Sequence, residues 1–392
     1  MAAGDAHDLR ARYDAATADL EPPLAIIDMA AFRANADDLV RRAGDTPVRL
    51  ASKSVRVRSL LEAVLQRPGF GGVLAYSLAE AVWLADHGVD DIVMGYPSVD
   101  RPSLRRIADE ESLAAAITLC VDDVGQLDFL TAVLGPGHAV VRLCMDIDTS
   151  WRPLGLYVGA RRSPVRSPAQ ASELAQEIKR RPGFRLVGVM TYEAQIAGIP
   201  DAGAAVRWMK SRSAREIDRR RRRVLDAISS DADLEFVNAG GTGSLEVSAA
   251  GDGVTEVTAG SGLFGPTLFD QYRTFRPVPA VAFALPVLRR PGPRTVTVAG
   301  GGYPASGPAG WSRLPTPYLP PGLRVLRTEG AGEVQTPLRG READALSLGS
   351  RVWFRPAKAA EICERFLSVH LVEGDRVVAT VPTYRGESRA FG

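Results

Sequence analysis

The sequence is poor in the residues that most often bind metal ions or form disulfides. It has three cysteines and four histidines among 392 residues. Cys120, Cys144 and Cys363 show no metal-ligand spacing, which excludes a cysteine-based metal site of the usual kind. An odd, unpaired set of cysteines is typical of a reducing compartment. We therefore expect a cytoplasmic protein.

Long hydrophobic runs and a large net charge are also missing. We find no N-terminal signal segment and no apolar stretch of transmembrane length, so we expect no membrane as a partner. The net charge of +2 gives no reason to expect nucleic acid as a partner. An arginine run at 219–223 lies in a long helical pattern beside Glu216 and Asp218, and we interpret it as a solvated helix face.

The composition that remains is that of an ordinary globular enzyme. Apolar residues make up 45% of the chain and charged residues 24%, which are typical values. A chain of this length exceeds a single hydrophobic core, so we expect one large domain and a smaller one.

Short apolar segments alternate regularly with helical segments between residues 47 and 260. The predicted strands lie near 47–52, 72–76, 91–95, 115–121, 139–147, 186–193, 234–238 and 255–260. Because they are apolar throughout, they fit a parallel sheet that is covered on both faces. We predict an α/β fold, a TIM-like parallel (β/α)8 barrel, with a doubly wound open sheet as the alternative.

After the eighth strand the pattern changes to short strands separated by turns. We predict a β-rich C-terminal domain over 277–392, in which 300–322 forms a long ordered loop. Residues 23–276 are assigned to the barrel, and residues 1–22 to an N-terminal segment that packs with the β domain. A strand at 24–28 is open to two assignments, since it precedes the barrel and can also join the β domain.

Polar residues gather at the ends of the predicted barrel strands, where the active sites of such barrels form. In chain order they are Lys53, Tyr76, Tyr96, Arg152, Tyr192, Glu193, Gln195, Gly240-Gly241-Thr242-Gly243 and Gly260-Ser261-Gly262. A buried amine with a lowered pKa is nucleophilic and can later carry a proton, and glycine-rich turns present backbone N–H groups to anions. An amine that faces such a turn across a barrel mouth is what pyridoxal phosphate requires. We predict that Lys53 forms its Schiff base and that the two glycine runs bind its phosphate.

The other residues of this rim are assigned to the cofactor or to the substrate. Tyr76 and Tyr192 are expected to contact the cofactor, with Tyr192 near its ring and barrel packing as the alternative. Arg152 is expected to contact the ring or a substrate carboxylate, with an ordinary salt bridge as the alternative. Glu193 and Gln195 are expected to face the substrate.

These residues together resemble the fold-type III pyridoxal phosphate enzymes, the alanine racemase N-terminal-domain superfamily. The matching features are the segment from Pro22-Pro23 to Asp28, Lys53, Tyr192, the two glycine runs, and Phe354 to Glu361 followed by a β-ribbon. The resemblance is to alanine racemase at the level of fold, and closer to D-threonine aldolase and D-serine dehydratase, in a group described as amino acid deaminase/aldolase. It implies a homodimer in which each β domain closes the partner's barrel.

The chain departs from the D-threonine aldolase pattern where that family binds a divalent metal. The pattern has a histidine and a nearby cysteine or aspartate, but the segment here is Arg355-Pro356-Ala357-Lys358-Ala359-Ala360-Glu361. We therefore expect no metal site of the family type, and predict that the Lys358 ammonium takes its place with Glu361 as partner. The base for the substrate hydroxyl is then Glu193 or Lys358.

The resemblance implies a pyridoxal phosphate-dependent lyase, of the aldolase or the deaminase/dehydratase type. Its substrate is expected to be a D-configured or unusual β-hydroxy amino acid. The first alternative is a racemase or epimerase, because Tyr303 lies in a stretch similar to the one that supplies the opposing base in racemases. The second is a non-catalytic cofactor-binding protein, against which the additional β domain argues.

Overall fold

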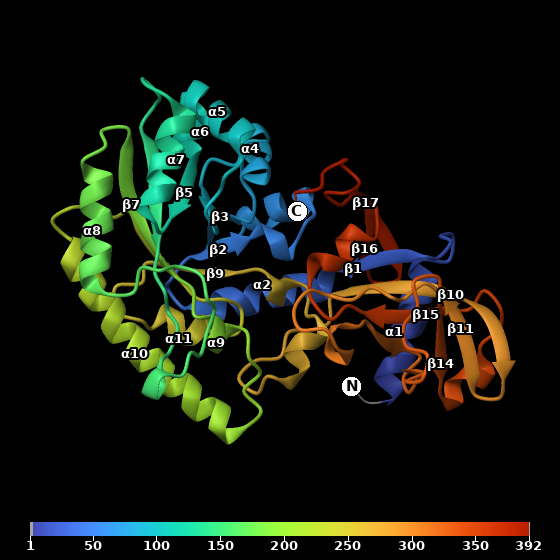
Figure 1. Ribbon diagram of the computed structural model, residues 1–392. Helices are drawn as coiled ribbons and strands as arrows, with labels where there is room; N and C mark the ends of the chain where they lie inside the picture. The colour runs from blue at the N-terminus through green and yellow to red at the C-terminus, as the bar shows by residue number, and fades with distance from the viewer. Residues whose placement is uncertain (1–2, 392) are drawn as a thin grey trace.

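Eight parallel strands close into a barrel in the first two thirds of the chain. The structure is a computed structural model that describes residues 3–391. The barrel strands are β2 (Val48–Ala51), β3 (Phe70–Ala75), β4 (Ile92–Met94), β5 (Ile117–Val121), β6 (Val141–Asp146), β7 (Phe184–Thr191), β8 (Phe236–Ala239) and β9 (Glu256–Ala259). The last strand pairs with the first, with Leu50 opposite Ala259, which closes the sheet. The predicted barrel is confirmed, and the open-sheet alternative is wrong (Figure 1).

Helices cover the outside of the barrel. They are α2 (Met29–Ala43), α3 (Arg58–Leu65), α4 (Leu78–Asp86), α5 (Arg101–Asp109), α6 (Glu111–Ala116), α7 (Val124–Leu134), α8 (Pro168–Lys179), α9 (Ala194–Ala197), α10 (Ala204–Ile228) and α11 (Leu245–Ala249). The Ser77 hydroxyl caps α4, and Ser167 forms a capping box with Gln170 at the start of α8. Both caps lie between a barrel strand and the helix that follows it, so they help to fix these loops at the mouth of the barrel.

The arginine run in α10 is only partly a solvated face, so that interpretation needs correction. Arg220 and Arg221 are 9% and 4% exposed, whereas the other three arginines of the run are exposed. Nε of Arg221 donates to Oγ1 of Thr191 at the end of β7, at 3.2 Å. Successive residues of a helix point in different directions, so a contiguous run cannot share one face.

A nine-stranded sheet makes up the second part of the molecule. Its strands are β1 (Leu24–Asp28), β10 (Val281–Gly292), β11 (Thr295–Ala299), β12 (Thr316–Leu319), β13 (Arg324–Val325), β14 (Gln335–Arg339), β15 (Arg351–Arg355), β16 (Ser368–Glu373) and β17 (Arg376–Pro382). β1 lies between β10 and β16, with Ile26 opposite both Ala282 and His370. The predicted loop at 300–322 is not entirely irregular, because it contains β12 and a 3₁₀ turn at Trp311–Arg313.

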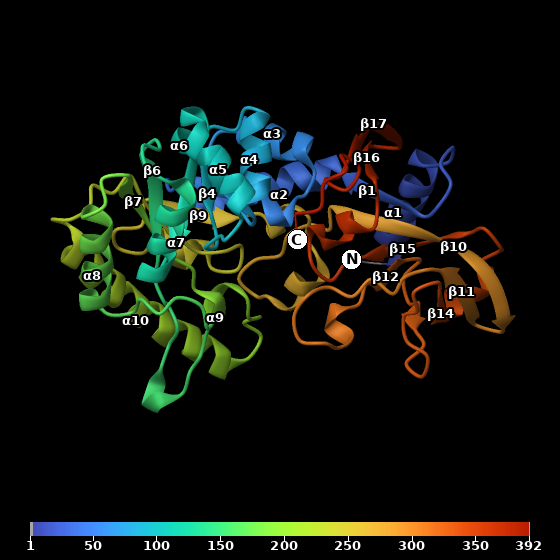
Figure 2. The ribbon, with the colours of Figure 1, turned by 45° about the horizontal axis from the view of Figure 1, so that its top comes forward.

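Asp28 connects the sheet to the barrel. Its Oδ1 caps α2 by accepting from the backbone N–H of Ala30 at 3.1 Å, and its own N–H donates to the Ala280 carbonyl at 2.8 Å. Helix α1 (Ala3–Ala16) packs on the sheet, where the Tyr13 ring lies 5.3 Å from that of Trp353. The sheet and the barrel lie side by side along the long axis of the molecule (Figure 2). No helix of residues 3–391 is long and apolar enough to cross a membrane.

Candidate active site

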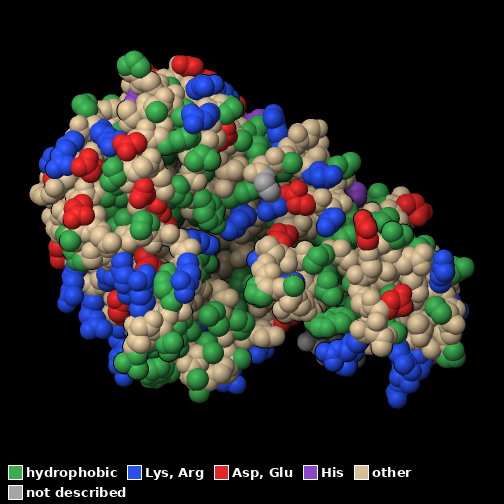
Figure 3. All heavy atoms as spheres, in the orientation of Figure 1, with side chains coloured by type: hydrophobic (Ala, Val, Ile, Leu, Met, Phe, Trp, Pro, Cys, Tyr) green, Lys and Arg blue, Asp and Glu red, His purple; other side chains and the backbone are tan. Residues whose placement is uncertain are grey.

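A cavity of about 840 Å³ opens at the carboxyl ends of the barrel strands. One side is formed by residues that follow the barrel strands, and the other by two segments of the β domain, 303–306 and 356–362. Figure 3 shows Lys and Arg side chains along the hollow between these two parts of the molecule. The site is therefore built jointly by both parts.

Lys53 enters this cavity from the barrel side. It lies in a 3₁₀ turn, Ser52–Ser54, directly after β2. The predicted buried amine is instead exposed to the open cavity. Its Nζ donates to the hydroxyl oxygen of Tyr96 at 2.9 Å. Burial pushes the pKa of Tyr96 upward, but the adjacent Lys53 and Arg162 charges outweigh burial and hold that pKa below its usual value.

The glycine run after β8 is a tight turn at the floor of the cavity. Gly240 has φ of 86°, and a Cβ on Gly241 would lie 2.9 Å from that of Ala197, so both positions need glycine. The Gly240 N–H donates to Glu193 at 2.9 Å and the Gly241 N–H to Ser244 at 3.1 Å. Two of the four N–H groups of this run are thus used within the protein.

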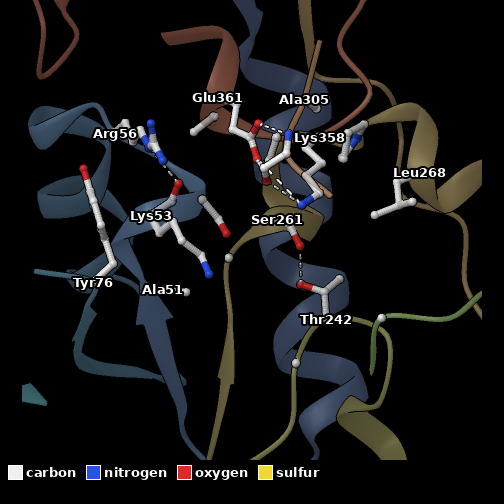
Figure 4. A pocket seen from close by; sticks show the side chains of 18 of the residues that line it. Ala51, Lys53, Arg56, Tyr76, Thr242, Ser261, Leu268, Ala305, Lys358 and Glu361 are labelled. Atoms are coloured by element: carbon white, nitrogen blue, oxygen red, sulfur yellow. Dashed lines mark hydrogen bonds and ion pairs between the residues drawn. The ribbon is translucent and has the colours of Figure 1, made fainter. Parts of the chain in front are cut away.

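Thr242 joins this turn to the second glycine run. Its Oγ1 accepts from the Gly262 N–H at 3.2 Å and from the Ser261 hydroxyl at 3.1 Å. Figure 4 shows Thr242 and Ser261 facing each other in the pocket. Gly260 also borders the cavity, and a Cβ there would lie 2.6 Å from the Ala51 carbonyl oxygen. The two runs therefore form one small polar cradle beside Lys53.

Glu193 and Gln195 do not line the cavity, which corrects their predicted contact with substrate. The buried Glu193 carboxylate supports the glycine turn, because it accepts from Gly240 and from the Ser248 hydroxyl at 3.0 Å. Burial raises its pKa, and nearby Arg221 opposes this effect. Gln195 donates through Nε2 to the Thr149 carbonyl at 2.7 Å. Both side chains turn away from the cavity into the barrel wall.

Arg152 also lies outside the cavity lining, which corrects its predicted contact with the ring or the substrate. It forms the alternative salt bridge instead, 2.7 Å from Asp148. Arg162, a residue that the sequence did not single out, takes the inner position. Its guanidinium lies 5.4 Å from the ring centroids of both Tyr96 and Tyr192.

Asp146, at the end of β6, is a second lining residue that the sequence did not single out. Burial and the nearby Asp122 raise the pKa of its carboxyl to about 7, against the opposing charge of Arg162. Tyr192 lines the same wall, and burial raises its pKa. Tyr76 also lines the cavity, with the Arg56 guanidinium 5.2 Å from its ring centroid.

Lys358 enters from the side of the β domain, opposite Lys53 (Figure 4). Its Nζ donates to Oγ of Ser306 at 2.8 Å, and the Ser306 hydroxyl donates to Oε1 of Glu361 at 2.6 Å. Burial lowers the pKa of Lys358, Glu361 opposes that shift, and the charges of Arg313 and Lys53 add to it. The predicted Lys358–Glu361 pair is present at 3.7 Å, and Ser306 is the link between them that the sequence did not reveal.

Tyr303 borders the cavity, but its hydroxyl is turned toward its own loop. A Cβ on Gly300 would lie 2.6 Å from the Tyr303 oxygen, so the phenol rests against that glycine. The ring lies 5.6 Å from Phe283. Across residues 3–391 no three His, Cys, Asp or Glu side chains are grouped so that they could hold a metal ion.

The residues of this cavity fit pyridoxal phosphate. Lys53 offers an amine, Tyr192 an aromatic wall, and Thr242 and Ser261 a polar cradle at positions where glycines keep the backbone close. Residues 27–267 match the family model described as "Alanine racemase, N-terminal domain". The chain belongs to this family. The resemblance stated from the sequence is confirmed.

The chain is also similar to several named lyases. It is 24% identical over 255 residues to a D-threonine aldolase of Arthrobacter sp, covering 63% of this chain and 62% of that protein. The chain thus matches about three fifths of the length of this curated relative.

Solved structures extend the similarity to the whole fold. D-threonine aldolase from Filomicrobium marinum superposes with a TM-score of 0.79 at 20% identity, over 95% of this chain and 98% of that one. D-threo-3-hydroxyaspartate dehydratase from Delftia sp. HT23 superposes with a TM-score of 0.73 at 19% identity, over 93% and 97%. The fold that the chain shares with these two structures therefore includes the β domain.

Proposed function

We propose that this chain is a pyridoxal phosphate-dependent lyase that acts on a D-configured or unusual β-hydroxy amino acid. The observation that carries the proposal is the entry of Lys53 and the Lys358–Ser306–Glu361 chain into one cavity from opposite sides. The similarity to D-threonine aldolase and D-threo-3-hydroxyaspartate dehydratase supports it.

Lys53 is the residue that would hold the cofactor, and Thr242 and Ser261 would bind its phosphate. When bound, pyridoxal phosphate supplies an electron sink for the pair left on the substrate Cα after a bond to it breaks. Tyr192 and Arg162 line the cavity and would border the cofactor ring. Asp146 lies on the same wall, and its raised pKa lets it hold a proton near neutral pH.

Lys358 and its partners would handle the substrate hydroxyl. In the aldolase reaction the Cα–Cβ bond breaks, the hydroxyl oxygen becomes a carbonyl, and its proton must move to a base. The neutral amine of Lys358 can accept that proton at Nζ, and Ser306 connects it to the Glu361 carboxylate. Lys53, held by Tyr96, can return a proton to Cα. No step in this scheme requires a divalent metal.

Elimination of the hydroxyl is the second candidate reaction, because the same Lys358 ammonium can donate a proton to the leaving oxygen. Racemisation is favoured less, since the Tyr303 hydroxyl rests against Gly300 within its own loop. The homodimer and the cytoplasmic location are part of this proposal and rest on the family resemblance and on the unpaired cysteines.

One endpoint assay by mass spectrometry tests the reaction type. Cofactor-loaded protein is incubated in deuterated water with the D and L forms of threonine and serine, with and without a chelator. Glycine plus aldehyde in both conditions is the expected result for a metal-independent aldolase. A 2-oxo acid indicates elimination, and deuterium at Cα with inversion would overturn the proposal in favour of a racemase.

Two variants assign the roles in this assay. Lys53→Ala should abolish both covalent cofactor attachment and turnover. Lys358→Met should retain the cofactor and lose cleavage, and full activity of this variant would remove Lys358 from the reaction. Arg152→Ala is the matched control at the rim, because Arg152 lies outside the cavity lining.

A further inference from the structure

The cavity carries more positive charge than the cofactor and a simple amino acid require. Seven Lys and Arg side chains line it, against three Asp and Glu side chains, among the residues that the structure describes. Two of the carboxylates already pair with lining cations: Glu364 lies 2.6 Å from Arg56, and Glu361 lies 3.7 Å from Lys358. Such an excess in a concave, partly buried site attracts anions.

Arg313 stands out among these cations because its guanidinium is incompletely bonded. Its Nε and Nη1 atoms are buried and have no hydrogen-bond partner within residues 3–391. No other described residue of the cavity lining has such an atom. Buried N–H groups of an ionised side chain are costly to leave without an acceptor, which points to an acceptor that comes from outside the chain.

The loop around Arg313 holds the guanidinium in place. Gly307 has φ of 116°, and a Cβ there would lie 3.1 Å from Cζ of Arg313, so the guanidinium occupies the space above this glycine. The Arg313 carbonyl accepts from the Ala305 N–H at 2.7 Å, and its own N–H donates to Gly310 at 3.0 Å. Fixed backbone on both sides of the loop preorganises the side chain for binding.

Arg313 is also close to the group proposed to act on the substrate hydroxyl. Its charge contributes to the lowered pKa of Lys358. Ser306, the residue before Gly307, is hydrogen bonded to both Lys358 and Glu361. The guanidinium therefore borders the region where a substrate side chain would extend beyond its hydroxyl.

We propose that Arg313, near Lys358, forms a subsite for a second anionic group, a carboxylate or a phosphate, on the side chain of the amino-acid substrate. The fork of an arginine guanidinium matches both groups. This subsite rests on the proposed function only in requiring that an amino acid enters the cavity.

Binding of amino acids without a free β-hydroxyl to the cofactor-loaded protein tests the subsite separately from aldol cleavage. The absorbance of the bound cofactor reports the affinity for D-alanine, D-asparagine, D-aspartate, D-glutamate and O-phospho-D-serine. We expect D-aspartate, D-glutamate or O-phospho-D-serine to bind at least about tenfold more tightly than D-asparagine, which corresponds to one charge-assisted hydrogen bond. The D-aspartate and O-phospho-D-serine arms distinguish a carboxylate from a phosphate. No preference for any anionic amino acid in the wild-type protein would overturn the proposal.

Variants at Arg313 separate this subsite from a site for the α-carboxylate. Arg313→Gln should lower the affinity for the anionic amino acids to that for D-asparagine and change the affinity for D-alanine by no more than about twofold. Arg313→Lys should retain part of the preference for anionic amino acids. An equal loss of affinity for D-alanine would overturn the proposal, because Arg313 would then bind the α-carboxylate that all amino acids share. A preference for anionic amino acids without any cleavage would keep the subsite and contradict the lyase.

Discussion

The Lys53 ammonium donates a hydrogen bond to the Tyr96 phenol at 2.9 Å, so the amine proposed to hold the cofactor has a fixed hydroxyl partner. The nearby cations hold the pKa of Tyr96 below its usual value despite burial, which makes the phenol a better proton carrier than an ordinary tyrosine.

Tyr96→Phe should therefore retain the cofactor and slow the reaction. Loss of an assisting proton carrier typically lowers kcat by about 100-fold. The measurement is kcat beside the absorbance spectrum of the loaded enzyme. Unchanged kcat in a fully loaded variant would show that Lys53 moves its proton without Tyr96.

We expect substitution of Glu193 to lower the affinity for the cofactor rather than kcat. Its carboxylate accepts hydrogen bonds from the Gly240 N–H and the Ser248 hydroxyl and so supports the glycine turn. Glu193→Ala should weaken binding of pyridoxal phosphate by about tenfold or more, since a buried hydrogen bond is worth about 1–3 kcal/mol when its partner is left unsatisfied. At saturating cofactor kcat should stay within about twofold.

Ser248→Ala is the milder control for that variant, because it removes one of the two hydrogen bonds and no charge. Titration of the apoenzyme followed by fluorescence gives both affinities. If Glu193→Ala bound the cofactor normally but lost kcat, the carboxylate would belong to the reaction after all.

The proposed role of Lys358 as a base implies that kcat/KM depends on pH. Its neutral form is the base, so kcat/KM should rise as pH rises through the pKa of Lys358, which burial lowers below the usual value of about 10.4. Because Glu361 opposes that shift, Glu361→Gln should move the rise to still lower pH. The pH profile of kcat/KM, recorded for the wild type and for Glu361→Gln, measures the rise and its displacement. If the rise persisted in Lys358→Met, another group would be the base.

Because of Asp146, we expect the free energy of unfolding to fall as pH rises. Its pKa is raised from 3.8 to about 7, so the folded protein binds a proton more tightly than the unfolded chain does. The stabilisation is present below the unfolded pKa and is lost as pH rises through about 7. Asp146→Asn should stabilise the apo-protein at pH 8 by up to about 4 kcal/mol, and by less at pH 5. Urea unfolding at the two pH values measures this difference.

Asp148 provides a control for which the expected change in stability has the opposite sign. The Ser150 hydrogen bonds, together with Arg152 and Arg166, lower its pKa despite burial. Asp148→Asn should therefore destabilise the protein at pH 8, and the effect should vanish as pH falls through the folded pKa of Asp148. If both variants changed stability in the same direction, local packing rather than charge would be responsible.

The barrel could be predicted because its evidence is local and repeated. Each strand is a short apolar run, each is followed by a helical pattern, and the polar rim follows from the position of strand ends. Lys53, Tyr76, Tyr192 and Thr242 reach the cavity for this reason.

The sequence could not give the direction of side chains in the loops. Arg152 lies in the loop after β6 and turns to Asp148, whereas Arg162 returns to the cavity only because the same loop folds back. Glu193 directly precedes the short helix α9 and Gln195 lies in it, and their directions depend on contacts with the glycine turn and with α10. Ser306 and Arg313 lie in a loop of the β domain, and only the packed structure brings them to Lys358. Tyr96 was visible at a strand end, and its role needed the distance to Lys53.

The position of β1 also has a consequence for biosynthesis. This apolar strand is synthesised before both of its neighbours, β10 and β16, which come from residues 281–292 and 368–373. The whole barrel must be made before Leu24–Asp28 can pair on either side. A nascent or truncated chain that ends near residue 280 carries an unpaired hydrophobic strand, the kind of edge that recruits chaperones or seeds aggregation.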